Sequence, residues 1–283
     1  MLLQLLFTGS PSSEPSLQPT LQPSIQVTQI PQASQSSTAS PETLQEAVQR
    51  GIAYCEGIQE PYGWLMLNVM YRQFGIAAFN DSLQRYDAVI AVEPPNAGIL
   101  RIFRRMASYN NTVYPDDWAQ VSEPLDQLTV PALYSDQFPL PDNYTEMLEQ
   151  AVNSGGDTLT HALLASVWLQ DNGVQVPLSA GFISNMYHET AALINSSVVT
   201  DLELEAAAFL YLAGQGALVN PSFVNDVITV QNVDGGWLQM SNMPGNSYWH
   251  ASVLALIILL HVEYPLGSYP PMIPELFDQH LVM

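Results

Sequence analysis

Lysine is absent from this chain, and its six arginines all precede Met106. From Met106 onward there are 19 acidic residues and neither lysine nor arginine. The net charge of −21 makes nucleic acid a poor partner, because an acidic surface repels a phosphate backbone. A buried carboxylate in the second part of the chain must therefore find its partner in histidine, a metal ion or a hydrogen-bond donor.

Where the scarce residue types do occur, they support two structural expectations. The single cysteine, Cys55, excludes an intrachain disulfide framework and a cysteine-rich zinc site, and we expect its thiol to be buried as a small apolar group. The only basic cluster contains Arg101, Arg104 and Arg105. We expect it to form ion pairs with acids of the C-terminal half. The alternative is that it binds an anionic ligand or a lipid headgroup.

Residues 1–40 combine a short apolar start with a linker rich in Pro, Ser and Gln. Residues 1–7 are apolar but too short to span a membrane and lack the positive charge that opens a signal peptide. We interpret them as the remnant of a truncated signal or anchor, or as a miscalled start. Residues 15–26 repeat a Pro-led tetrapeptide, which predicts a disordered tether. A tether to a membrane or wall indicates an extracellular or cell-envelope protein, although a cytosolic linker would look similar.

Residues 41–283 are predicted to form one helical domain. Apolar residues recur there with helical spacing, and the expected helices are 41–60, 62–74, 82–92, 97–109, 144–153, 158–171, 180–196, 201–214, 221–230 and 248–264. Residues 110–141 are rich in Pro and Asp and predict a long loop with short helical pieces, in which Leu128–Leu133 could be extended. The sequence therefore predicts an all-α fold.

Three of the expected helices begin alike. His161, Glu205 and His250 occupy equivalent early positions, at spacings of 44 and 45 residues. A repeat of this length corresponds to two helices with their loops, the unit of a helical-hairpin array. Because each unit adds one helix in each direction, the three matching helices should run parallel. We therefore expect the three side chains to converge on one side of the fold.

Two imidazoles and a carboxylate suit Zn²⁺ or Fe²⁺ with an open coordination position. Histidines near the positive end of a helix have lowered pKa values, which favours the neutral, metal-binding form. His188 and Glu189, on the intervening helix, are candidates for supporting such a site. The alternatives are acid–base chemistry without a metal and a purely structural role in capping or packing. Asp201 is explained by a capping box that opens its helix.

Four aromatic residues lie close to this candidate triad in the repeat pattern. Trp237, Trp249, Tyr187 and Tyr211 are candidates for lining a substrate pocket, and the alternative is an ordinary place in the core. His261 and His280 are interpreted as ordinary surface or rim residues.

The run from Gln231 to Trp237 reads Gln-Asn-Val-Asp-Gly-Gly-Trp and precedes the helix led by His250. This order resembles the repeats of terpenoid cyclases and protein prenyltransferase β-subunits, which are built as α/α toroids. The match covers the Gln-x3-Gly-x-Trp half of their repeat, whereas Asp226 stands where an aromatic residue is usual. The resemblance in architecture extends over about residues 41–264 and implies a toroid of helical hairpins.

The catalytic motifs of those families are matched less completely. A histidine that opens such a helix ligates zinc in prenyltransferase β-subunits, and the segment Tyr248-Trp249-His250 is similar, but the accompanying cysteine ligand has no counterpart. The Asp-x-Asp-Asp acid motif of the cyclases has only a shifted segment, from Asp201 to Glu205, as its nearest equivalent. The Asp-Asp-x-x-Asp motif of ionising synthases is absent.

These observations predict an α/α toroid that is preceded by a disordered tether. The first functional hypothesis is an enzyme-like domain with a central pocket for an apolar or glycan-like substrate. In it, His161, Glu205 and His250 are metal ligands or acid–base groups. The second hypothesis is a non-catalytic binding domain of the cell envelope that holds a small molecule, lipid or glycan in the same pocket.

Overall fold

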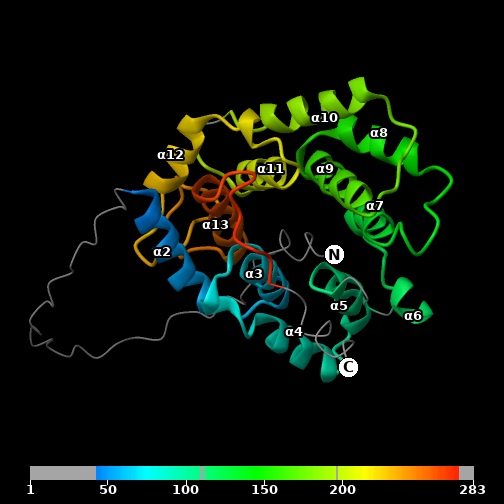
Figure 1. Ribbon diagram of the computed structural model, residues 1–283, viewed down its shortest axis with the longest axis horizontal. Helices are drawn as coiled ribbons and strands as arrows, with labels where there is room; N and C mark the ends of the chain where they lie inside the picture. Colours follow the sequence, from blue (N-terminus) through cyan, green and yellow to red (C-terminus); the bar gives the residue numbers. More distant parts are fainter. Residues whose placement is uncertain (1–42, 109–110, 112, 196, 274–283) are drawn as a thin grey trace, which may run out of the picture.

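The computed structural model describes residues 43–108, 111, 113–195 and 197–273, and these residues are helical, without a β-strand (Figure 1). The predicted all-α class is confirmed for them, whereas the predicted tether of residues 1–40 lies outside them. None of the helices in the described ranges is long and apolar enough to cross a membrane. The α-helices are α2 (Leu44–Glu56), α3 (Pro61–Phe74), α4 (Ser82–Ala91), α5 (Ala97–Phe103), α6 (Pro115–Trp118), α7 (Pro124–Leu133), α8 (Tyr144–Ser154), α9 (Gly156–Asp171), α10 (Ala180–Ala192), α11 (Asp201–Leu212), α12 (Pro221–Thr229) and α13 (Trp249–Glu263), and the 3₁₀ helices are η1 (Ala77–Phe79), η2 (Arg104–Met106) and η3 (Gly216–Leu218).

Helix boundaries follow recognisable local signals. Thr43 opens α2 with a capping box, and Pro61 stands in the first turn of α3, where no backbone N–H is needed. Gly75 ends α3 with a φ of 71°, a left-handed conformation that glycine adopts without strain. The capping box predicted for α11 is also present, because Thr200 and Glu203 bond each other's backbone N–H. These signals explain why helix positions are readable from the sequence.

Helices α3, α11 and α13 run in the same direction. Helix α11 packs on α13, and α13 packs on α3. Glu205 and His250 face each other in the N-terminal parts of α11 and α13. Near the other ends of these helices, Tyr211 stacks on His261 with ring centroids 5.7 Å apart. Phe74, the last residue of α3, meets the same His261 ring edge-on at 5.1 Å. The parallel direction expected from the repeat is thus observed for α11 and α13.

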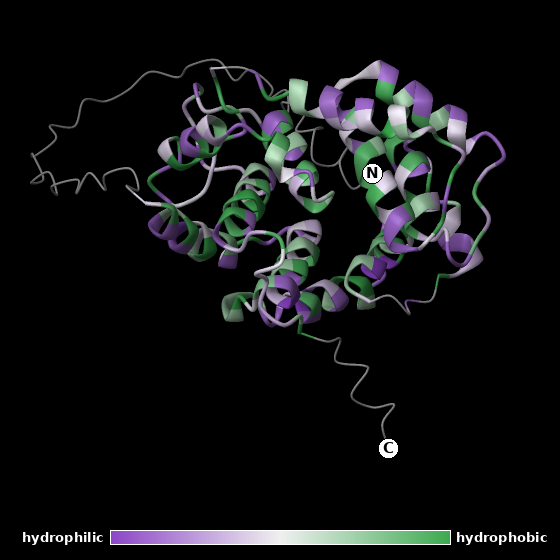
Figure 2. Ribbon diagram, turned by 45° about the horizontal axis from the view of Figure 1, so that its top comes forward, coloured by the Kyte–Doolittle hydropathy of each residue, from purple (hydrophilic) through white to green (hydrophobic). Residues whose placement is uncertain are grey.

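Helix α13 is the most deeply buried element in the described chain. Every residue from His250 to His261 is buried, which is why this stretch is almost uniformly apolar rather than amphipathic. In Figure 2 the outlying helices carry most of the hydrophilic residues, as expected for helices with one solvated face. Both polar ends of the α13 stretch, His250 and His261, are therefore held inside the protein.

The first and last parts of the described chain are joined to each other. Helix α2 packs on α13, and the two lie beside α12 on the left of Figure 1. The hydroxyl of Tyr54 donates to the carbonyl of Ser247 at 2.9 Å, and Arg50 donates to the carbonyl of Asn232 at 2.7 Å. These contacts bridge more than 180 residues of sequence. They fix the loop that leads into α13 against the first described helix.

The basic cluster is neutralised inside the protein. The ion pairs are Arg101–Asp117 (2.6 Å), Arg101–Glu93 (3.0 Å), Arg104–Asp87 (2.6 Å) and Arg105–Asp136 (2.5 Å). The predicted internal pairing is confirmed, but not with the C-terminal half, because all four acids lie in the first half of the 283-residue chain. Cys55 is fully buried, also as expected.

One segment differs from its predicted structure. Leu128–Leu133, interpreted as possibly extended, belongs to α7. A short buried apolar run does not reveal its period, so a strand and a buried helix look alike in sequence. Pro131 is tolerated because it lies near the end of α7, where its missing N–H removes only one hydrogen bond of the final turns.

Candidate functional site

The N-terminal parts of α9, α11 and α13 bring His161, Glu205 and His250 together, as the repeat predicted. Nδ1 of His161 lies 3.6 Å from Oε1 of Glu205, and Nε2 of His250 lies 3.9 Å from Oε2 of Glu205. All three side chains are at least 98% buried, since their exposed fractions are 2%, 0% and 1%. Both distances exceed those of hydrogen bonds, so these contacts are close but not direct.

Two further side chains complete what we call the polar cluster: Thr160, His161, Asp201, Glu205 and His250. The Thr160 hydroxyl donates to Oε1 of Glu205. The Asp201 carboxylate accepts from Nδ1 of His250 at 2.8 Å. Thr160 was missed by the sequence analysis, and Asp201 was assigned a capping role alone. The available signal was that Asp201 precedes Glu205 by one helical turn, so both face the same side.

The hydrogen bonds of the two histidines fix their tautomers. Nδ1 of His161 lies 2.5 Å from the carbonyl of Asp157, and because a carbonyl only accepts, this nitrogen carries the proton. Nδ1 of His250 likewise donates to Asp201. When either ring is neutral, its Nε2 is the basic atom.

Burial controls protonation within the cluster. The pKa of Glu205 is raised well above its usual value, mainly by complete burial, while the Thr160 hydrogen bond opposes this and nearby Asp201 adds to it. The raised pKa favours the protonated, neutral form of Glu205. Its Oε1 is hydrogen-bonded to the Thr160 hydroxyl, whereas its Oε2 has no hydrogen-bond partner among the described residues. Burial also lowers the pKa of His161 to about 4, against the opposing effect of the Asp157 carbonyl, so this imidazole is neutral.

The hypothesis that Zn²⁺ or Fe²⁺ is bound by His161, Glu205 and His250 does not fit this geometry. In the described part of the chain, no group of three or more His, Cys, Asp or Glu side chains is arranged to hold a metal ion. The hydrogen bonds of Nδ1 in the two histidines do not decide this, because metal-bound histidines commonly donate from the ring nitrogen that does not bind the ion. The raised pKa of Glu205 opposes metal binding, because a metal ion binds the deprotonated carboxylate. The arrangement instead favours hydrogen bonding and proton transfer.

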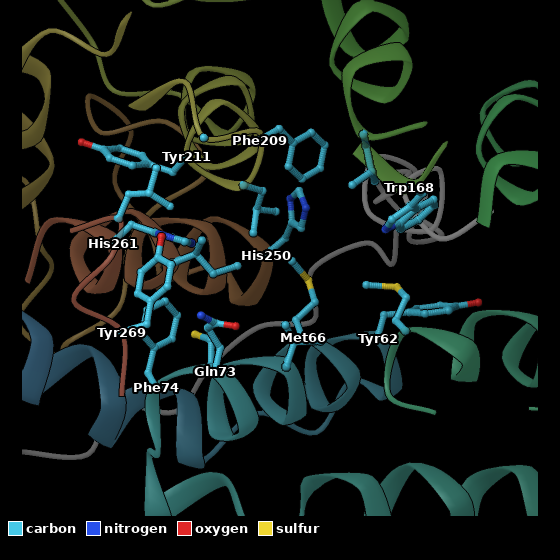
Figure 3. Close-up of a pocket in the computed structure, with 18 of the residues that line it drawn as sticks. Tyr62, Met66, Gln73, Phe74, Trp168, Phe209, Tyr211, His250, His261 and Tyr269 are labelled. Atoms are coloured by element: carbon cyan, nitrogen blue, oxygen red, sulfur yellow. The ribbon is translucent and has the colours of Figure 1, made fainter. Parts of the chain in front are cut away.

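A cavity of about 250 Å³ adjoins the polar cluster (Figure 3). Side chains of α3, α9, α11 and α13 line it, and most of them are apolar or aromatic. Of the polar cluster, His250 lines the cavity, whereas Glu205 and His161 lie behind it. Figure 3 shows the His250 ring between Phe209 and Met66. An engineered apolar cavity of roughly 150 Å³ takes up benzene, so this one has room for a larger apolar ligand.

The four predicted pocket aromatics divide into two groups. Trp249 and Tyr211 line the cavity together with His250. Trp237 does not, because it is 1% exposed, its indole N–H donates to the carbonyl of Val227 at 2.7 Å, and its ring covers Gly51 of α2. Its large ring fills the core beneath α13 instead.

The predictions made for α10 are wrong. Tyr187 is half-buried on this helix and is not among the residues that line the cavity. His188 and Glu189 are exposed, so they cannot support the polar cluster. The sequence placed α10 between two members of the repeat, but an intervening helix packs outside the helices it connects and turns its polar residues to solvent.

The Asp-Gly-Gly-Trp turn positions α13. Gln231 donates to the carbonyls of Ala47 and Gly235, at 2.9 Å and 2.8 Å. Gly235 has a φ of 92°, and an added Cβ would lie 2.4 Å from the Arg50 carbonyl oxygen, so only glycine fits there. The turn thus sets where α13, and with it His250, begins.

His261 was interpreted as a surface or rim residue, but it is 7% exposed and lines the cavity. It follows His250 by three helical turns and so lies on the same face of α13. That spacing was the signal available in the sequence. His280 lies outside the described residues.

Comparison with protein-family models, with curated proteins and with solved structures finds no match to this chain. The resemblance to terpenoid cyclases and prenyltransferases therefore stays a prediction from the Gln-to-Trp motif. The functional argument rests on the site itself.

Proposed function

We propose that this domain is an α/α toroid that binds an apolar small molecule in its central cavity and transfers a proton to or from it at His250. The observation that carries the proposal is the position of His250. This ring lines an apolar cavity, is held at Nδ1 by Asp201 and has the neutral acid Glu205 behind it. The apolar lining favours an apolar substrate over a glycan, which needs many hydrogen-bonding groups.

The order of helix contacts supports the toroid. Helices α3, α13, α11, α9 and α7 pack in succession. Beyond α7, Arg105 donates to the carbonyl of Leu133 and Tyr134 donates to the carbonyl of Ile102, each at 2.8 Å, and η2 in turn contacts α3. This succession returns to its starting helix. The even-numbered helices α2, α4, α8, α10 and α12 then form the outer layer.

His250 and three other members of the polar cluster have roles in the proposed chemistry. Asp201 keeps the proton of a neutral His250 on Nδ1, so that Nε2 is a base facing the cavity. When Nε2 takes a proton from a carbon atom of the substrate, the Asp201 carboxylate stabilises the imidazolium. The imidazolium then returns a proton from Nε2 to the substrate carbanion, which restores the neutral imidazole. Glu205, whose Oε2 lies 3.9 Å from Nε2, packs behind the ring and is oriented by Thr160.

Proton exchange on a small ketone tests this function. β-Tetralone is a compact apolar ketone, and the replacement by deuterium of the protons beside its carbonyl is followed by NMR in D₂O. We expect wild-type protein to accelerate the exchange and His250→Gln to reduce that acceleration by roughly a hundredfold. His188→Gln is the matched control, because His188 is exposed on α10. Equal rates for wild type and His250→Gln would contradict the proposal.

Binding without chemistry is the second candidate, and one observation favours it. Glu205 and His161 do not line the cavity, so a ligand meets only His250 of the polar cluster. In that case β-tetralone should raise the melting temperature of the protein through binding to the native state while its protons exchange at the uncatalysed rate.

We also propose that the domain is presented outside the cytoplasm, at the cell envelope, on a tether formed by residues 1–40. The composition of that segment supports this proposal, since its Pro-led repeats and lack of aromatic residues after Phe7 suit a spacer rather than a folded unit. Its expected partners are a membrane or wall, and the acidic domain that follows excludes nucleic acid.

A further inference from the structure

The end of the cavity remote from His250 is built from three hydrogen-bonding side chains: Gln73, His261 and Tyr269. Nδ1 of His261 lies 2.8 Å from the hydroxyl of Tyr269. The His261 ring stacks on Tyr211 at an interplanar angle of 16° and meets Phe74 edge-on. Figure 3 shows His261 between Tyr211 and Tyr269. Ring contacts on three sides hold this imidazole in one orientation.

Gln73 contributes an amide that makes no hydrogen bond to the described residues, although it lines the cavity. In Figure 3 the amide extends from α3 toward the space beside His261. An amide presents one acceptor oxygen and two donor hydrogens. A polar group in an apolar cavity lowers its free energy when a ligand supplies the missing hydrogen bond.

The two polar ends of the cavity are far apart. His250 and His261 lie on one face of α13, three turns and about 16 Å from each other at the usual rise of an α-helix. Apolar side chains, among them Met66, Met70 and Ile257, line the stretch between them. The cavity of about 250 Å³ is therefore lined at both ends of this stretch of α13. A cavity of this length accommodates a hydrocarbon chain.

Charge restricts the head group further. Neither lysine nor arginine is among the residues that line the cavity. Burial lowers the pKa of His261 to about 4, so its imidazole is neutral at physiological pH. An anionic head group would lose its hydration there without gaining a cationic partner, which is costly. An uncharged group that donates and accepts hydrogen bonds meets no such cost.

We propose that Gln73, His261 and Tyr269 form a binding site for the uncharged polar end of a chain-like ligand, such as a long-chain alcohol, whose apolar chain runs along α13 to His250. This inference rests on the proposed function, because the chain occupies the same cavity. It adds the chemical class of the substrate and the direction in which the substrate lies along the cavity. It also disfavours a phosphate or diphosphate ester, since neither lysine nor arginine is among the described residues that line the cavity.

Binding of dodecanol and dodecyl phosphate tests the inference. Trp168 and Trp249 line the cavity, so their fluorescence reports occupancy. We expect dodecanol to bind, Gln73→Leu to weaken its binding about fivefold through loss of one neutral hydrogen bond, and dodecyl phosphate to bind more than tenfold more weakly than dodecanol. Gln49→Leu is the control, since Gln49 is exposed on α2. Far-UV circular dichroism verifies that each variant is folded.

The outcomes separate this inference from the proposed function. If Gln73→Leu and Gln49→Leu bind dodecanol equally well, or dodecyl phosphate binds as tightly as dodecanol, the head-group site is wrong. Exchange of β-tetralone that still depends on His250 would then leave the proposed function standing. If dodecanol does not bind and β-tetralone does not exchange, both are wrong. A fivefold loss confined to Gln73→Leu supports the head-group site.

Discussion

Nδ1 of His250 lies 2.8 Å from Oδ2 of Asp201, and both side chains are almost completely buried. The two residues are 49 positions apart and come from the first turns of adjacent helices, α13 and α11. Asp201 also occupies the first position of α11, where the helix dipole favours a negative charge. The pair therefore links two helices and fixes the orientation of the ring that faces the cavity.

Removing the Asp201 carboxylate should destabilise the protein. In Asp201→Ala, Nδ1 of His250 stays buried without its acceptor, so we expect the free energy of unfolding to fall by about 2 to 3 kcal/mol. Urea denaturation at pH 7 measures the change. Asp171→Ala, at an exposed position in the last turn of α9, should change it by less than about 0.5 kcal/mol. Equal effects would mean that the His250–Asp201 contact contributes little.

Glu205 should produce a loss of stability as pH rises. Its pKa is raised in the folded protein, so between pH 4.5 and that raised pKa the unfolded chain releases a proton that the folded chain retains. Wild type should therefore lose stability relative to Glu205→Gln as pH rises above 4.5, by up to about 1.4 kcal/mol per pH unit. Urea denaturation from pH 5 to 8 follows the difference. Glu189 is exposed on α10, so the free energy of unfolding of Glu189→Gln should change with pH in the same way as that of wild type.

His161 should have the opposite pH dependence. Because burial lowers its pKa from 6.5 to about 4, the unfolded chain binds a proton in this interval that the folded chain does not. The stabilising effect is complete above pH 6.5 and is lost toward pH 4, by up to about 3 kcal/mol. His161→Asn retains a donor for the Asp157 carbonyl and removes the titration. The stability advantage of wild type over this variant should shrink as pH falls, and a constant difference would contradict the assignment.

The turn before α13 should tolerate no side chain at Gly235. In Gly235→Ala the new Cβ would collide with the Arg50 carbonyl, in addition to the strain of a φ of 92°. Gly267→Ala is the matched control, because its φ is 88° and nothing lies within 4 Å of the added atom. We expect about 1 kcal/mol of destabilisation at Gly267 and at least about 3 kcal/mol at Gly235. Similar losses at both positions would show that the close approach to Arg50 is relieved easily.

The sequence predicted the helical fold and the meeting of His161, Glu205 and His250. Both predictions depend on periodicity, which a single sequence contains: apolar residues repeat within each helix, and whole hairpins repeat along the chain. The convergence of the three side chains then follows from helices that run in one direction. The capping box at Thr200 was readable for the same reason, because its partners are three residues apart.

What the sequence did not reveal depends on contacts between distant elements. Trp237 was expected in the pocket, but its ring fills the core beneath α13 and packs against α2. The direction in which this side chain points is set by packing between distant helices, which the sequence does not show. Asp201 was explained by a local role in capping its helix. That explanation did not reveal the hydrogen bond that Asp201 accepts from His250, which is 49 residues away. His261 looked peripheral because it stands near the end of a helix, whereas the segment through Tyr269 covers it. The metal interpretation finds no support among the described residues, in which no group of three or more His, Cys, Asp or Glu side chains is arranged to hold an ion, because residue types alone do not show how side chains are oriented toward one another.

The position of a bound ligand tests the central claim most directly. Intermolecular nuclear Overhauser effects between dodecanol and protein protons identify the side chains that touch the chain. The cavity along α13 predicts contacts from dodecanol to the His250 ring and to Met66 and Met70. A second hollow of about 880 Å³, lined in part by Trp118 and Phe138, is the competing apolar site. Contacts confined to that hollow, or their absence at saturating dodecanol, would contradict the assignment of the His250 cavity as the ligand site.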